Sequence, residues 1–160
     1  MNKANALVVA CIGIIVLMGL FFSFYYKSDE PTNSHDYLNA VITLQRTGCF
    51  GTCPIYTVTI YGDGRVVYDG GGYVLVAGMQ TSQISEYDVR GLIDEFFRID
   101  YFSLQDEYTA GITDLPWTIT SITIDGKTKE IRDYYGSPQT LRDLESRIDQ
   151  VANTKIWVGP

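Results

Sequence analysis

The strongest constraint on the fold is the alternating stretch at residues 55–69, which reads IYTVTIYGDGRVVYD. Its first half alternates apolar and polar side chains, which is typical of a β-strand with one buried face. Gly62, Asp63 and Gly64 follow, and glycine supplies the positive φ that a tight reversal needs. The run RVVYD from Arg65 returns as the partner strand. The stretch therefore predicts a β-hairpin.

A second hairpin is predicted at residues 117–135, where the runs WTITSITID and KTKEIRDYY meet around Asp125 and Gly126. An Asp-Gly pair between alternating runs is among the strongest short-range signals for a hairpin turn. Apolar residues at 40–44 predict a further strand before the first hairpin. We also expect a strand at 73–78, YVLVAG, with the three glycines before it interrupting the ladder.

Two stretches change to the period of an amphipathic helix. Ser85 precedes the first as a capping residue with an acidic residue three positions later, and the second begins at Ser137 and Pro138. The apolar residues of both follow at helical spacing: Val89, Leu92, Ile93, Phe96 and Phe97, then Leu141, Leu144, Ile148 and Val151. The order of strands, helix, hairpin and helix predicts an α+β class with a mostly antiparallel sheet.

The N-terminal residues 6–26 form an apolar run of 21 residues without a charge. A helix of that length crosses a hydrocarbon core of roughly 30 Å, so we expect one transmembrane helix within an anchor at residues 1–27. A cleaved signal peptide is one alternative, although the run ends in bulky aromatic residues. A lipoprotein signal acylated at Cys11 is another, although only a short segment precedes it.

The polar stretch after the anchor predicts a linker at residues 28–39, followed by one domain at 40–160. This part of the chain carries ten Lys or Arg against 19 Asp or Glu, a surface that should repel nucleic acid. A long acidic domain after a single first span is normally exported, so we expect it in the periplasm or outside the cell. That compartment is oxidising, which bears on the cysteines.

Residues 48–54, GCFGTCP, place two cysteines four positions apart. Gly48 and Gly51 let the loop turn tightly enough for the two Cα atoms to approach within about 7 Å. Pro54 then donates no ladder hydrogen bond at the start of the strand. We therefore interpret Cys49 and Cys53 as a structural disulfide, which stabilises by about 2 kcal/mol in the chain-entropy model.

A redox-active pair is the sharper alternative for these cysteines. Thioredoxin-like sites separate their cysteines by two residues and place the first at a helix N-terminus, whereas here three residues intervene and a strand follows. The nearest cation in the sequence is Arg46. No metal site is expected, because a closed zinc site needs about four Cys or His ligands and the sole histidine, His35, falls in the linker.

Several long segments together resemble an uncharacterised family of bacterial envelope domains, catalogued as a domain of unknown function. They are TGCFGTCPIYTVTIYGDGRVVYDG, FFRIDYFSLQDEY, TDLPWTITSITIDGKTKEIRDYYGSP and the closing helix, and the similarity extends from about residue 41 to 151. The most specific element is the loop G-C-x-G-x-C-P-x-Y with its following G-D-G turn. The resemblance implies a secreted, anchored or lipid-tethered protein and carries no catalytic residues.

The segment at residues 101–117, YFSLQDEYTAGITDLPW, is longer than most connections in compact domains, and such loops are often binding loops. We expect its candidate binding surface to include Tyr101, Phe102, Tyr108, Asp114 and Trp117. The alternative is that its aromatic residues cap the core and that the remainder is ordinary loop.

A carboxylate-based hydrolase is a further alternative, since Asp106, Glu107 and Asp114 lie in one irregular segment. The GDG and GGG runs lack the context of phosphate-binding loops and are interpreted as turns. Taken together, the sequence predicts a membrane-tethered extracytoplasmic binding or scaffolding module that is not an enzyme. It is expected to use no cofactor and to have an envelope protein as its partner.

Overall fold

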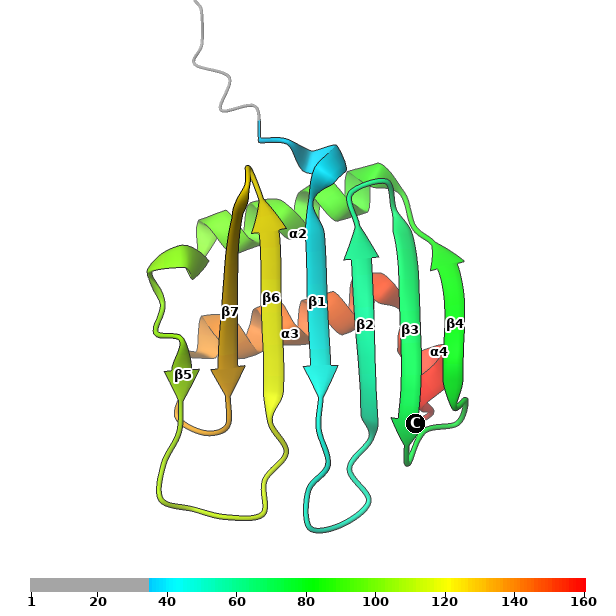
Figure 1. Cartoon of the computed structure of the whole chain (residues 1–160), viewed down its shortest axis with the longest axis vertical. Coiled ribbons are helices and arrows are strands. Elements are labelled where there is room, and N and C mark those ends of the chain that lie inside the picture. Colours follow the sequence, from blue (N-terminus) through cyan, green and yellow to red (C-terminus); the bar gives the residue numbers. More distant parts are fainter. Residues whose placement is uncertain (1–34) are drawn as a thin grey trace, which may run out of the picture. The chain divides into compact units, whose positions relative to one another are not determined.

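The computed structural model, which describes residues 35–160, has a seven-stranded sheet with helices on one of its faces (Figure 1). The strand order is β4-β3-β2-β1-β6-β7-β5, and all neighbours are antiparallel except β5 and β7. The strands are β1 Val41–Arg46, β2 Ile55–Tyr61, β3 Arg65–Gly72, β4 Gly78–Gln83, β5 Glu107–Tyr108, β6 Thr118–Ile124 and β7 Lys127–Asp133. The predicted α+β class with a mostly antiparallel sheet is confirmed.

Strand β1 lies at the centre of the sheet because it pairs with β2 on one side and with β6 on the other. Thr43 is opposite Thr59 of β2 and opposite Ser121 of β6. The four-stranded meander β1 to β4 and the hairpin β6–β7 are therefore joined through one strand. Both predicted hairpins are present, with Asp125 and Gly126 at positive φ in the second turn.

The two long helices, α2 Glu86–Arg98 and α3 Gln139–Ala152, cross the same face of the sheet (Figure 1). Short helices add η1 Tyr37–Asn39, η2 Tyr101–Ser103 and α4 Lys155–Val158. Ser85 caps α2, since its hydroxyl accepts a hydrogen bond from the Asp88 N–H at 3.1 Å. The core lies between sheet and helices and contains the expected apolar residues, among them Ile42, Leu44, Val58, Ile60, Val89, Leu92, Ile93, Phe96, Leu141, Leu144 and Ile148.

The strand expected at residues 73–78 is wrong. Strand β3 continues through the three glycines to Gly72, residues 73–77 form a bend with Tyr73 at positive φ, and β4 follows at Gly78. Position 70 in the ladder requires glycine because the backbone at Val76 lies close to it: a Cβ on Gly70 would lie 2.3 Å from the Val76 carbonyl oxygen. Strand β4, GMQTSQ, has no apolar alternation because it lies at the edge of the sheet, with most of its residues exposed.

The described part of the chain begins at one end of the sheet. His35 stacks on Phe97 with ring centroids 3.9 Å apart, and its Nδ1 lies 2.6 Å from Asp125 Oδ2 in the β6–β7 turn. Within residues 35–160 no helix is long and apolar enough to cross a membrane. The predicted transmembrane helix at 6–26 and the alternative acylation site at Cys11 lie outside the described residues.

Candidate functional site

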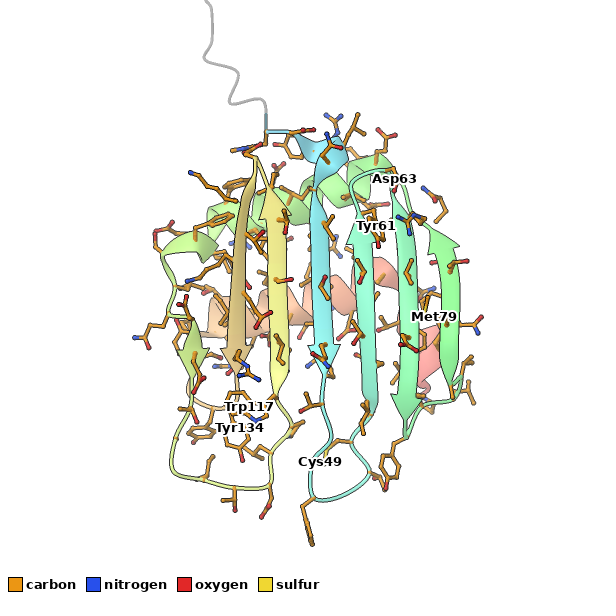
Figure 2. All side chains as sticks on the ribbon, in the orientation of Figure 1. Cys49, Tyr61, Asp63, Met79, Trp117 and Tyr134 are labelled. Carbon is orange, nitrogen blue, oxygen red and sulfur yellow. A yellow bond between two sulfur atoms is a disulfide. The ribbon has the colours of Figure 1, made fainter. Side chains whose placement is uncertain are left out.

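The loops at the other end of the sheet, away from His35, contain the predicted cysteine pair (Figures 1 and 2). Cys49 and Cys53 form the expected disulfide, with their Cα atoms 5.6 Å apart, in the loop between β1 and β2. The Gly51 N–H donates to the Cys49 carbonyl at 2.8 Å, which tightens the loop. Phe50, inside this small ring, has 91% of its surface exposed. The disulfide therefore presents an aromatic side chain to solvent.

At the last residue of β1, beside this loop, a polar network joins the sheet to helix α3. Arg46 donates from Nε and Nη2 to Asp149 Oδ2 at 3.0 and 2.7 Å. The other carboxylate oxygen of Asp149 accepts from the hydroxyls of Tyr56 and Thr154, each at 2.8 Å. Arg46 Nη1 also donates to Thr118 Oγ1 at 3.0 Å. The network therefore fixes the ends of three strands to the C-terminal end of α3.

The polar groups of Arg46, Tyr56 and Asp149 form hydrogen bonds to one another. Burial, followed by the charge of Asp149, raises the pKa of Tyr56 to about 12, so the phenol stays protonated near neutral pH. A cavity of about 400 Å³ lies beside Tyr56 and Asp149 and is also lined by Lys155. Because Asp149 already accepts four hydrogen bonds, its carboxylate is a structural group rather than a free base.

The loop before β6 and the loop after β7 are held beside the disulfide loop by hydrogen bonds and ring contacts. The Trp117 N–H donates to Thr47 Oγ1 at 2.8 Å, and the Thr47 N–H donates to the Trp117 carbonyl at 3.0 Å. The ring centroids of Trp117 and Tyr134 lie 4.8 Å apart, and Arg132 lies over the Trp117 ring. Figure 2 labels Trp117 and Tyr134 next to each other. The Tyr134 hydroxyl accepts from the Leu115 N–H at 3.1 Å. Residues 47, 115, 117 and 134 thus hold three loops together.

The other residues of the predicted binding surface do not gather at this place. Tyr101 is 0% exposed and its hydroxyl donates to the Thr120 carbonyl at 2.6 Å, so its assignment to a binding surface is wrong and it belongs to the core. Phe102 is half-buried against Phe97. The Tyr108 hydroxyl accepts from the Gln105 N–H at 3.2 Å.

The remaining two residues of that surface, Asp114 and Trp117, lie at the loop end. Asp114 is exposed with φ 76°, and Trp117 is half-buried. The loop at 109–117 also carries exposed Ile112 and Leu115, which the sequence analysis did not single out. We define the loop-end surface as Phe50, Ile112, Leu115 and Tyr135, four exposed apolar side chains on three neighbouring loops.

Helix α3 also carries a buried carboxylate, Glu145, that was not predicted from the sequence. Glu145 is 4% exposed and accepts one hydrogen bond, from Thr120 Oγ1 at 3.3 Å. Burial, and next the charge of Asp133, raises the pKa of Glu145 to about 7. Helical periodicity would have found it, because position 145 lies on the same face as Leu141 and Ile148. Glu145 does not line the cavity of about 390 Å³ beside Asp133 and Ser137.

The acidic residues considered for hydrolysis are separated from both cavities. Asp106 pairs with Lys129, Glu107 is exposed in β5 and Asp114 is exposed in the loop. In residues 35–160 no three His, Cys, Asp or Glu side chains are grouped so that they would hold a metal ion. Asp106, Glu107 and Asp114 therefore do not meet at either of these two cavities.

Residues 40–152 match the model of a protein family described as a domain of unknown function, DUF6438. The chain belongs to this family. The DUF6438 match begins one residue before β1 and ends with α3, so it includes the whole sheet, the disulfide and both long helices. The resemblance to a domain of unknown function is thus confirmed, whereas the loop signature and the bacterial envelope stay predictions. No curated protein gives a significant match to this DUF6438 chain.

Proposed function

We propose that this DUF6438 domain is a non-catalytic binding module, tethered to a membrane outside the cytoplasm, which contacts an envelope protein through its loop-end surface. The observation that carries the proposal is the exposure of four apolar side chains, Phe50, Ile112, Leu115 and Tyr135, on loops at one end of the sheet that covalent and polar contacts hold together. Exposed apolar groups on a monomeric surface mark interaction sites when they cluster. Aromatic side chains held rigidly are typical anchors of such interfaces.

The fixed loops favour binding because little flexibility is lost in the complex. The disulfide restricts the ring that carries Phe50, and Arg46 with Asp149 holds the strands on either side. Two hydrogen bonds between Thr47 and Trp117, one to the Trp117 carbonyl and one to the Thr47 hydroxyl, hold the neighbouring loop. A preorganised surface avoids much of the ordering free energy that association otherwise costs.

Residue 35, where the described residues begin, and the loop-end surface lie at opposite ends of the sheet. A tether that joins the domain at residue 35 attaches beside Asp125, whereas Phe50 is at the far end of the strands (Figure 1). Phe50 is then available to a partner in the same envelope. An oxidising compartment agrees with the Cys49–Cys53 disulfide.

Two other functions have less support. A thiol-disulfide protein would need an activated thiol, but the cysteine loop leads into strand β2 and Arg46 is already bound by Asp149. A carboxylate-based hydrolase would need its acidic residues around one cleft, and Asp106 is instead paired with Lys129.

Site-specific photo-crosslinking of the full chain tests the proposal. A benzophenone amino acid replaces Phe50 in one variant and Tyr87 in the other, since Tyr87 is 83% exposed on α2 and lies outside the loop-end surface. We expect position 50 to give one discrete protein adduct in the envelope and position 87 to give none. The substitution Leu115→Ser should weaken the adduct at position 50. Equal labelling at both positions, or adducts with lipid alone, would show that the loop-end surface has no protein partner.

A further inference from the structure

The two edges of the sheet differ in how they are protected. Natural proteins protect exposed edges with short strands, charged residues, proline or bulges, because an open edge pairs with other chains. The β5 edge has such protection: it is two residues long and carries Asp106 and Glu107 at its start. The β4 edge, Gly78–Gln83, is six residues long and reads GMQTSQ, without a charge or a proline.

The backbone of β4 presents regular donors and acceptors at this edge. The Ile84 N–H donates to the Gly64 carbonyl at 2.9 Å, toward β3. Because successive residues of a strand direct their backbone groups to alternate sides, Met79, Thr81 and Gln83 direct theirs away from β3. In the described part of the chain no strand pairs with β4 on that side. Three residues therefore offer both an N–H and a carbonyl to an added strand.

The side chains of β4 are uncharged, and most of the charged residues near it in the sequence or in register are acidic. Met79 is 65% exposed and lies in register with Asp69 on β3, and Figure 2 shows it at the side of the sheet. The nearby charged residues on the turn, on β3 and at the start of α2 are Asp63, Asp69, Glu86 and Asp88 against Arg65, and Arg65 already lies over the Tyr61 ring. This surface is complementary to a cationic strand.

A second copy of the chain is the less favourable occupant. Antiparallel pairing of two β4 strands centred on Thr81 would place Met79 opposite Gln83 of the second copy. It would also bring two sets of the same four acidic residues to one interface, in a domain whose described residues are acidic overall. Like charges brought together oppose association.

We propose that the β4 edge binds an extended, cationic segment of a partner protein by strand addition. Main-chain hydrogen bonds to Met79, Thr81 and Gln83 would supply the affinity, and the acidic residues would select for Lys or Arg. This surface lies on β4 and is separate from the loop-end surface, so the two proposals fail or hold independently.

The test uses synthetic peptides with the full chain in detergent micelles. The probe is the acetylated and amidated heptapeptide KVTVTVK, and the readouts are its affinity and the hydrogen exchange of the β4 amides. We expect slower exchange at Met79, Thr81 and Gln83 with the probe bound. The acidic peptide EVTVTVE should bind at least about tenfold more weakly, because its glutamates are repelled by the acidic residues around β4.

Backbone methylation of the peptide gives a control that leaves the protein unchanged. Methyl groups on one alternating set of peptide amides should abolish binding, because those amides face β4, while methyl groups on the other set should not. In the protein, Thr81→Pro removes an outward N–H and should weaken binding about tenfold, while Thr81→Val should not.

Three results would overturn the proposal: equal binding of both methylated peptides, no protection of β4 by the probe, or β4 protection without probe in a chain that sediments as a dimer. The last result would assign the edge to a second copy. Phe50→Ser should leave probe binding unchanged, since Phe50 lies on a different loop from β4.

Discussion

Replacing Glu145 with glutamine should change how the stability of the domain depends on pH. The folded-state pKa of Glu145 is about 7, against an ordinary value of 4.5. A carboxyl whose pKa is raised on folding stabilises the fold fully below the unfolded-state value, and this contribution is lost as the pH rises through the folded-state value. At about 1.4 kcal/mol per pKa unit, the free energy of unfolding should fall by about 3 kcal/mol between pH 4.5 and 7.

Glutamine is neutral at every pH in this range and has the same shape. Its side-chain oxygen still accepts from Thr120, and the neighbouring Asp133, Arg46 and Asp149 are unchanged. Glu145→Gln should therefore match the wild type in stability near pH 4.5 and exceed it by about 3 kcal/mol above pH 7. Titrating groups that do not interact with Glu145 cancel in this difference.

Urea denaturation of both proteins from pH 4.5 to 8, followed by tryptophan fluorescence, measures this difference. Glu107→Gln is the matched control, because Glu107 is exposed on β5 and the substitution removes the same formal charge. A Glu145→Gln difference that stays constant across the pH range would refute the reasoning. It would mean that Glu145 is ionised in the folded protein at low pH.

Three further predictions concern the disulfide loop, its supporting network and α2. Asp149→Ala should lower the free energy of unfolding by about 2 kcal/mol, because it leaves the partly buried Arg46 without its carboxylate; chemical denaturation measures this. The double substitution Cys49→Ser and Cys53→Ser should cost about 2 kcal/mol, and the reducing agent that lowers wild-type stability should have no effect on this variant. Gly91→Ala should raise stability by about 1 kcal/mol, because Gly91 is exposed within α2 and a Cβ there meets nothing within 4 Å; a loss of thermal stability would contradict this.

Local signals were enough to predict much of the fold. The G-D-G and Asp-Gly turns with alternating flanks placed both hairpins, because strand period and turn chemistry act over a few residues. The position of β1 between β2 and β6 depends on pairing between distant segments, as in Val41 with Thr123, and no short motif encodes it. Strand β4 was missed because its sequence, GMQTSQ, has one large apolar side chain, Met79, and that side chain is exposed.

The candidate site was predictable only in part, for the same reason. The spacing of Cys49 and Cys53 with glycines predicted the disulfide, since the geometry is closed within one loop. Arg46 was noted as the nearest cation, but its partner Asp149 is 103 residues away in the sequence. Tyr101 was predicted on a loop surface, but its ring packs on Phe96 in the core, and the Thr120 carbonyl on β6 accepts from its hydroxyl.

The central position of β1 has a consequence for the order in which the chain can fold. Synthesis from the N-terminus can complete the β1–β4 meander early, but the second edge of β1 has no partner until residues 118–124 emerge. Until then the apolar Ile42 and Leu44 belong to an incomplete sheet, a kind of intermediate that is prone to aggregate. A nascent chain that stalls before β6 should therefore require a chaperone, whereas the Cys49–Cys53 disulfide in the loop between β1 and β2 can already close.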